Sequence, residues 1–171
     1  MNNITKYGIA FLALLLVVLF FDGTHADAYY TTNQSAVTLE ESVGLYTIDF
    51  MFAHEDYDIY IPIIATRAPE RVSDTLLSYT VLDRNDTIVE DGASAGIVLS
   101  NAKIQNGMYI VPKGTVRRFT LLTLFTPTNT DTPNEFRTHV THLPFSFDGT
   151  RQLQLNQSEL VKYTTPLTTL R

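Results

Sequence analysis

The sequence predicts an all-β protein, an antiparallel sandwich or barrel, and three observations favour this fold class. From residue 29 onward, Thr supplies 22 of 143 residues, and Tyr, Val, Ile and Phe are also frequent. This is the composition of pleated, half-buried surfaces. Apolar positions alternate, whereas helical spacing is almost absent. Turn-forming residues interrupt the chain at roughly the short, regular spacing of sandwiches and barrels, so we expect seven to nine short strands.

The clearest strand signal lies in residues 43–53, where Tyr46, Ile48, Phe50 and Phe52 occupy every second position. Side chains of a strand point alternately to its two faces. These four side chains are therefore expected to share one face of the strand and to point into the core.

Residues 57–65 form the next expected strand, and Pro62 within it marks an edge or a bulge because proline cannot donate to a ladder. A polar turn begins at His54 and separates this strand from residues 43–53. The two strands are therefore expected to form a hairpin. The other expected strands cover residues 76–82, 87–90, 97–100, 108–111, 115–126 and 136–147, with a short last strand at 152–155.

Residues 115–126 are the longest expected strand, and both of its faces are apolar. Phe119, Leu121 and Phe125 lie on one face, and Leu122 and Leu124 lie on the other. Strands that are apolar on both faces are usually covered on both sides. We therefore expect this strand to be central and covered on both faces.

An apolar run of 14 residues, 8–21, follows Lys6 near the start of the chain. It is too short to span a hydrocarbon core of ~30 Å, and the small-x-small triplet Ala26-Asp27-Ala28 follows it. This pattern predicts a secretory signal peptide cut before Tyr29, with an uncleaved anchor as the alternative. The expected organisation is a signal peptide over 1–28, a linker over 29–35, the β-sandwich domain over 36–149 and a C-terminal extension or tail over 150–171.

The turn Val111-Pro112-Lys113-Gly114 leads into the Phe-Thr-Leu-Leu-Thr-Leu segment that begins at Phe119. Together with the strands before it, this segment resembles the immunoglobulin-like modules of exported bacterial surface proteins, over roughly residues 36–147. The resemblance implies an immunoglobulin-like sandwich with a structural, adhesive or binding role. It implies no catalytic residue.

Composition and charge exclude several classes of site. The chain has no Cys, which excludes disulfides, thiolate zinc sites and cysteine nucleophiles. Its net charge is −6. This charge argues against sequence-independent binding to nucleic acid, because such binding needs a basic surface. No nucleophile elbow, phosphate loop or dinucleotide fingerprint occurs in the sequence. These absences favour a non-enzymatic protein.

Three carboxylates, Glu55, Asp56 and Asp58, crowd into four positions of the loop that begins at His54. Hard oxygen ligands at this density are typical of calcium sites, so the three residues are weak calcium candidates, with solvated turns as the alternative. If other turns meet this loop at one end of the sandwich, further oxygen ligands would come from Asp83, Asn85 and Asp86 or from Asn129, Asp131 and Glu135.

Tyr57 and Tyr60 are weak candidates for a sugar-binding face, with half-buried packing as the alternative. They fall on opposite faces of their expected strand, so at least one of them is expected to be exposed. His139 and His142 are three residues apart on an expected strand, which is a poor spacing for a shared metal.

We therefore expect an exported, non-enzymatic sandwich that acts through surface contacts, as a structural, adhesion or protein-interaction module of the cell envelope. Its expected location is secreted, periplasmic or on the cell surface, with an unidentified protein or envelope partner, no nucleic-acid partner and no membrane span in the mature chain. No cofactor is expected apart from the calcium candidate. The alternative is a module that binds carbohydrate or calcium, and a hydrolase is the residual hypothesis.

Overall fold

A computed structural model describes residues 27–69, 75–129, 134–155 and 157–171. The predicted signal peptide lies outside these residues except for its last two positions, and its cleavage stays a prediction. Within the described residues the regular secondary structure is almost entirely β, which confirms the all-β fold class. No helical segment in this part of the chain has the length and the apolar character that crossing a membrane requires.

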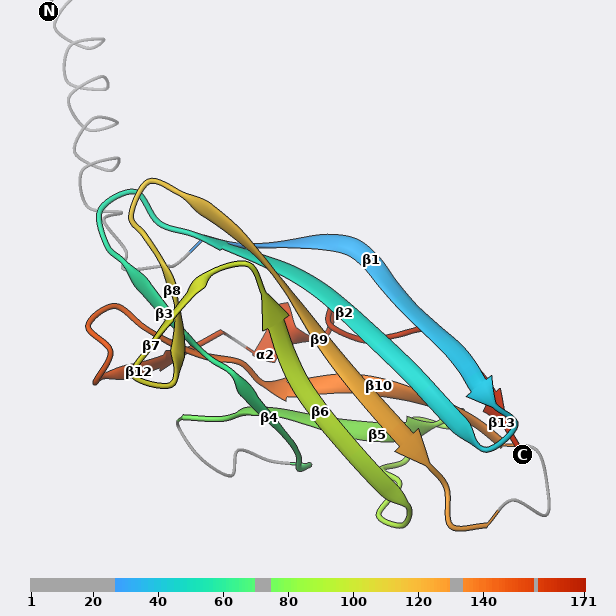
Figure 1. Ribbon diagram of the computed structural model, residues 1–171. Helices are drawn as coiled ribbons and strands as arrows, with labels where there is room; N and C mark the ends of the chain where they lie inside the picture. The colour runs from blue at the N-terminus through green and yellow to red at the C-terminus, as the bar shows by residue number, and fades with distance from the viewer. Residues whose placement is uncertain (1–26, 70–74, 130–133, 156) are drawn as a thin grey trace, which may run out of the picture.

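Two sheets make up the fold, and their eight and five strands exceed the predicted seven to nine (Figure 1). Sheet A has the order β1 (Asp27–Glu40), β2 (Val43–Ala53), β9 (Val116–Thr126), β6 (Ala93–Ser100), β4 (Ile64–Arg67), β5 (Leu77–Asp83), β10 (Asn134–His142) and β13 (Thr168–Leu170). Sheet B has the order β12 (Gln152–Gln154), β11 (Pro144–Ser146), β3 (Ile59–Pro62), β8 (Met108–Val111) and β7 (Lys103–Gln105). A short helix, α2 (Gln157–Leu160), precedes β13.

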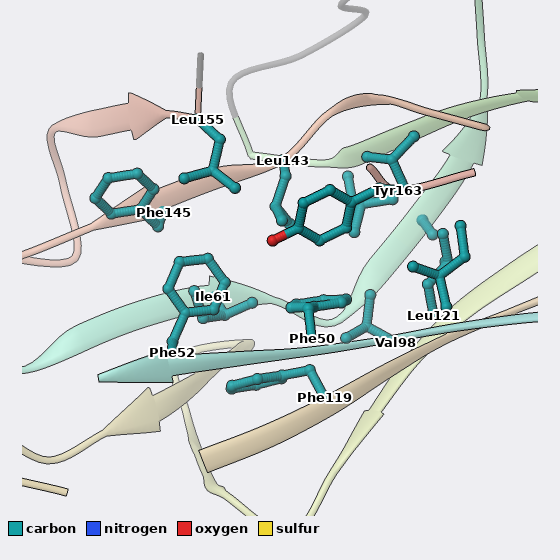
Figure 2. Close-up of a cluster of buried hydrophobic side chains, with 14 of the residues drawn as sticks. Phe50, Phe52, Ile61, Val98, Phe119, Leu121, Leu143, Phe145, Leu155 and Tyr163 are labelled. Carbon is teal, nitrogen blue, oxygen red and sulfur yellow. The ribbon is translucent and has the colours of Figure 1, made fainter. Parts of the chain in front are cut away.

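The main core lies between the two sheets and is built around aromatic side chains (Figure 2). Phe50 of β2 pairs in register with Phe119 of β9, and their rings stack with centroids 5.5 Å apart. Phe52 and Tyr163 meet Phe50 edge-on, at 5.9 and 6.1 Å. The strict alternation of buried and half-buried positions along β2 confirms the inward face predicted for residues 43–53.

The predicted hairpin between residues 43–53 and 57–65 is wrong. β2 pairs with β1 and β9 in sheet A, whereas β3 pairs with β8 and β11 in sheet B. The loop at His54 therefore carries the chain from one sheet to the other, which lets Phe52 and Ile59 both enter the shared core. β3 ends at Pro62, and the chain then returns to sheet A as β4.

β4 and β5 pair in parallel, which the antiparallel expectation did not include. Ala65 lies opposite Leu77 in this ladder. The connection between them runs through residues 68–76, part of which lies outside the described residues. A parallel pair needs a longer connection than a tight hairpin turn provides, and this segment supplies it.

The N-terminal segment expected as a linker, residues 29–35, belongs to β1. β1 pairs along almost all of its length with β2, with Tyr30 opposite Phe50 and Gln34 opposite Ile48. A shift in register separates these two pairs. The long strand β2 would otherwise expose a row of unpaired backbone groups at this edge, and residues 29–35 provide the partner.

The C-terminal segment expected as an extension or tail, residues 150–171, is instead an integral part of the fold. β12 pairs with β11, and β13 pairs with β10. Tyr163 and Leu170 are only 2% and 1% exposed. The apolar residues of this segment have no regular period in the sequence, because each enters the core from a separate short element.

Sheet A curls until its two edge strands meet, as the position of β13 beside β1 and β2 shows (Figure 1). The Thr38 hydroxyl of β1 donates to the Thr169 carbonyl at 3.1 Å. The backbone N–H of Arg171 donates to the Glu41 carbonyl at 2.6 Å. The last residues of the chain thus close the sheet against its first described strand.

Leu170→Ala should destabilise the protein by about 2–5 kcal/mol, the usual range for truncating a buried leucine. Leu170 packs with Tyr46, Phe125 and Phe136 in a second buried cluster, so its loss leaves a cavity there. The matched control is Leu167→Ala, since Leu167 lies in the same segment but is 39% exposed. Urea unfolding measures both variants. Equal, small effects for the two would show that the C-terminal segment is not part of the core.

Candidate functional site

The predicted acidic loop folds onto the turn between β8 and β9. The His54 Nδ1 atom accepts hydrogen bonds from the backbone N–H groups of Asp56 and Tyr57, at 3.1 and 3.2 Å. The His54 carbonyl accepts from the backbone N–H of Gly114 at 2.7 Å. The imidazole therefore shapes the loop, and these contacts give His54 a structural role.

The three calcium candidates of this loop do not converge. Asp58 Oδ1 accepts from the backbone N–H of Lys113 at 2.8 Å, while Glu55 and Asp56 are exposed to solvent. Among the described residues, no group of three or more His, Cys, Asp or Glu side chains is placed to hold a metal ion. Calcium binding by this loop stays a prediction.

The other turns considered as sources of oxygen ligands have contacts of their own. Asp83 Oδ1 accepts from the backbone N–H groups of Asn85 and Thr87, each at 2.8 Å. The contacts of Asp83 are typical of turn geometry. Asp86 forms an ion pair with Arg137 of β10. In the third turn, Asn129 and Glu135 are described and Asp131 lies outside the described residues.

Tyr57 and Tyr60 are both partly accessible, but the structure does not bring them into one site. Tyr57 is 51% exposed, and its ring lies 5.1 Å from that of His54 and 5.4 Å from that of Phe147. Tyr60 instead lines a separate cavity beside Gly149. The sequence predicted exposure for at least one tyrosine and placed the two on opposite faces of a strand, whereas Tyr57 lies in the loop before β3.

A groove of about 840 Å³ runs over β5 and β10. His139 lies in it with its Nδ1 atom 2.8 Å from the Thr164 hydroxyl. His142 also lines the groove and is 4% exposed. The remaining lining residues are Pro69, Thr80, Leu82, Asp86, Ile88, Val140, Thr141, Gln154, Leu155, Leu160 and Val161.

The outward side of sheet A over β1, β2, β9, β6 and β4, which we call the outer face, carries a cluster of apolar side chains bordered by polar ones. One row of registered partners crosses four strands, namely Val37, Leu45, Leu124 and Ala95. The next row crosses five, namely Ser35, Thr47, Leu122, Ile97 and Ile64. Directly opposite residues lie on the same side of a sheet, so these two rows form one surface.

Several aliphatic side chains of the outer face are strongly exposed. Val37 is 50% exposed, Ile64 61%, and Ile97 and Leu99 43% each. Leu122 and Leu124 on β9 are half-buried. The expectation that residues 115–126 are covered on both faces is therefore wrong, because only the Phe119 side of β9 enters the core. In the sequence, the apolar residues Leu122 and Leu124 on the second face of this strand were the signal for a solvent-exposed apolar surface.

Burial lowers the pKa of His139 from its ordinary value of 6.5, and the charge of Arg137 lowers it further. The unfolded chain therefore takes up a proton at this residue at a higher pH than the folded chain does. The resulting contribution to stability is complete above about pH 6.5 and falls as the pH decreases below it.

His139→Gln should reduce the loss of unfolding free energy between about pH 7.5 and about pH 5, because the variant has no imidazole to protonate. Urea unfolding at both pH values measures the loss for each protein, and the other titrating groups are common to both. If the wild type and the variant lose the same stability, His139 is not the group responsible.

Comparisons of this chain with protein-family models, with curated proteins and with solved structures find no match. Its function is therefore inferred from its own residues. The outer face of sheet A gathers exposed aliphatic side chains from β1, β6 and β4, and it is the candidate functional site.

Proposed function

We propose that the protein is an exported, non-enzymatic sandwich that acts through surface contacts and binds a protein partner through the outer face of sheet A. The observation that carries this proposal is the exposed apolar surface of Val37, Ile64, Ile97 and Leu99. Soluble proteins seldom leave a contiguous apolar patch uncovered, and such patches commonly mark sites of interaction.

Burial of this surface would supply the free energy of binding. Each of the four side chains is about half exposed, so covering one contributes on the order of 1 kcal/mol. The surface belongs to neighbouring strands joined by continuous ladders, which keeps its shape fixed before binding. A rigid surface loses little conformational entropy on binding, which favours high affinity.

The charges on the outer face favour an apolar, uncharged partner surface. Asp49 lies on the same face and is paired with Arg118, its neighbour on β9. The Thr120 hydroxyl also donates to Asp49. Both charges are thus compensated within the chain, and neither is left to attract a phosphate or an acidic partner.

The proposed location is secreted, periplasmic or at the cell surface, as an envelope structural, adhesion or protein-interaction module. The apolar run at residues 8–21 and the Ala26-Asp27-Ala28 triplet support export. The immunoglobulin-like character of the sandwich is part of the same proposal, supported by the turn and strand that begin at Val111.

Single-cysteine variants test the proposal, because the chain has no cysteine of its own. In the producing cells, the thiol of Ile97→Cys should react with a maleimide about tenfold more slowly than in the purified protein, since a bound partner shields it. The matched control is Lys103→Cys on β7 of sheet B, where the side chain is exposed. Its labelling rate should be the same in both settings.

Equal labelling of Ile97→Cys in cells and in purified protein would contradict the proposal. Protection that rises with the concentration of the purified protein would assign the outer face to a second copy of this chain and would overturn the choice of a different partner. Cross-linking from the thiol, followed by mass spectrometry, distinguishes a second copy from another protein.

A further inference from the structure

A small cavity lies on the outward side of sheet B, on the opposite sheet from the outer face. Tyr60 is half-buried between Ile59 and Ile61, which are fully buried, so its ring points away from the core. A Cβ atom built at Gly149 would lie 3.7 Å from the Tyr60 ring, which places the β11–β12 turn against that ring. The cavity holds about 150 Å³ and is lined by Tyr60, Gln105, Asn106, Met108, Asp148, Gly149 and Thr150.

One wall of the cavity is the tight turn between β7 and β8. Asn106 and Gly107 adopt φ angles of 52° and 77°, the pair of left-handed residues that defines a type I′ hairpin turn. This turn fixes the backbone at the wall. The side-chain amides of Gln105 and Asn106 are exposed and form no hydrogen bond within the described part of the chain, so both can bind a ligand.

The opposite wall is the turn between β11 and β12, which Asp148 holds in shape. Its Oδ1 atom accepts from the backbone N–H groups of Thr150 and Arg151, at 2.8 and 2.7 Å. The Ser146 hydroxyl bonds to the same carboxylate at 3.0 Å and accepts from the backbone N–H of Gly149 at 2.9 Å. The backbone hydrogen bonds from Arg151 and Thr150 hold the pKa of Asp148 far below its ordinary value. The carboxylate is therefore charged, and the wall is preformed.

The size and lining of the cavity select a class of ligand. A cavity of about 150 Å³ accommodates one six-membered ring. An aromatic ring beside two exposed amides and a carboxylate suits a ligand with a C–H face and a rim of hydroxyl groups. The lining has a carboxylate and no Lys or Arg, so it disfavours phosphates and acidic sugars. We propose that this cavity binds one neutral pyranose ring, such as the end of a glycan chain.

Titration of the purified protein with methyl glucopyranoside, methyl galactopyranoside, methyl mannopyranoside and N-acetylglucosamine tests the proposal, with amide chemical shifts as the readout. At least one of these sugars should bind at millimolar concentration and shift the amides of residues 105–108 and 148–150 in a saturable way. Tyr60→Leu should weaken this binding by about tenfold because it removes the aromatic face.

Asn106→Gly provides a second variant that keeps the turn, since glycine tolerates the left-handed conformation, and it should weaken binding by about threefold. The matched control is Tyr57→Leu, which removes an exposed tyrosine outside the cavity and should leave binding unchanged. The proposal is overturned if none of the four sugars gives saturable shifts, or if Tyr60→Leu and Asn106→Gly bind as the wild type does. Because the outer face lies on sheet A, neither result depends on the thiol labelling of Ile97→Cys.

Discussion

The stack of Phe50 on Phe119 is the contact on which the rest of the structure depends. These rings sit on neighbouring central strands of sheet A and receive Phe52 of the same sheet and Tyr163 of the C-terminal segment edge-on. Figure 2 shows Phe145 and Leu155 approaching from the same side as Tyr163. The chain has no cysteine, so no disulfide contributes to stability. The burial of these apolar side chains is the dominant favourable term in folding.

This core also explains why the C-terminal segment is part of the fold. Tyr163 must cross to the Phe50 stack, and the residues after it then reach the free edge of sheet A, where Arg171 bonds to Glu41. β2, β9 and β6 stay hydrogen-bonded to one another in the closed sheet. Side chains on their outward side, such as Ile97 and Leu99, remain exposed. The two proposed contact surfaces, the outer face and the cavity at Tyr60, are thus carried by opposite sheets of one rigid core.

Local pattern in the sequence predicted the strands better than it predicted their pairing. Alternation in residues 43–53 identified both the strand and its inward face, because that pattern reflects burial at neighbouring positions. The hairpin with residues 57–65 was wrong because a turn sequence does not say whether the chain returns in the same sheet or crosses to the other. Leu170 and Tyr163 gave no periodic signal, since each is buried by contacts with residues distant in the sequence. The outer face could not be predicted from the sequence, because the rows through Leu122 require the registers. Tyr60 of the cavity on sheet B was a candidate from the sequence alone.

Native-state amide hydrogen exchange tests most directly whether the core and the C-terminal segment form one unit. Exchange in a cooperative unit requires a shared opening, so its amides report the same free energy. If the core and the C-terminal segment are one unit, the amides of Phe50, Phe119, Val140 and Tyr163 exchange only through global unfolding, with one common free energy. Exchange at Tyr163 through a separate opening of much lower free energy, while Phe50 and Phe119 stay protected, would contradict this prediction.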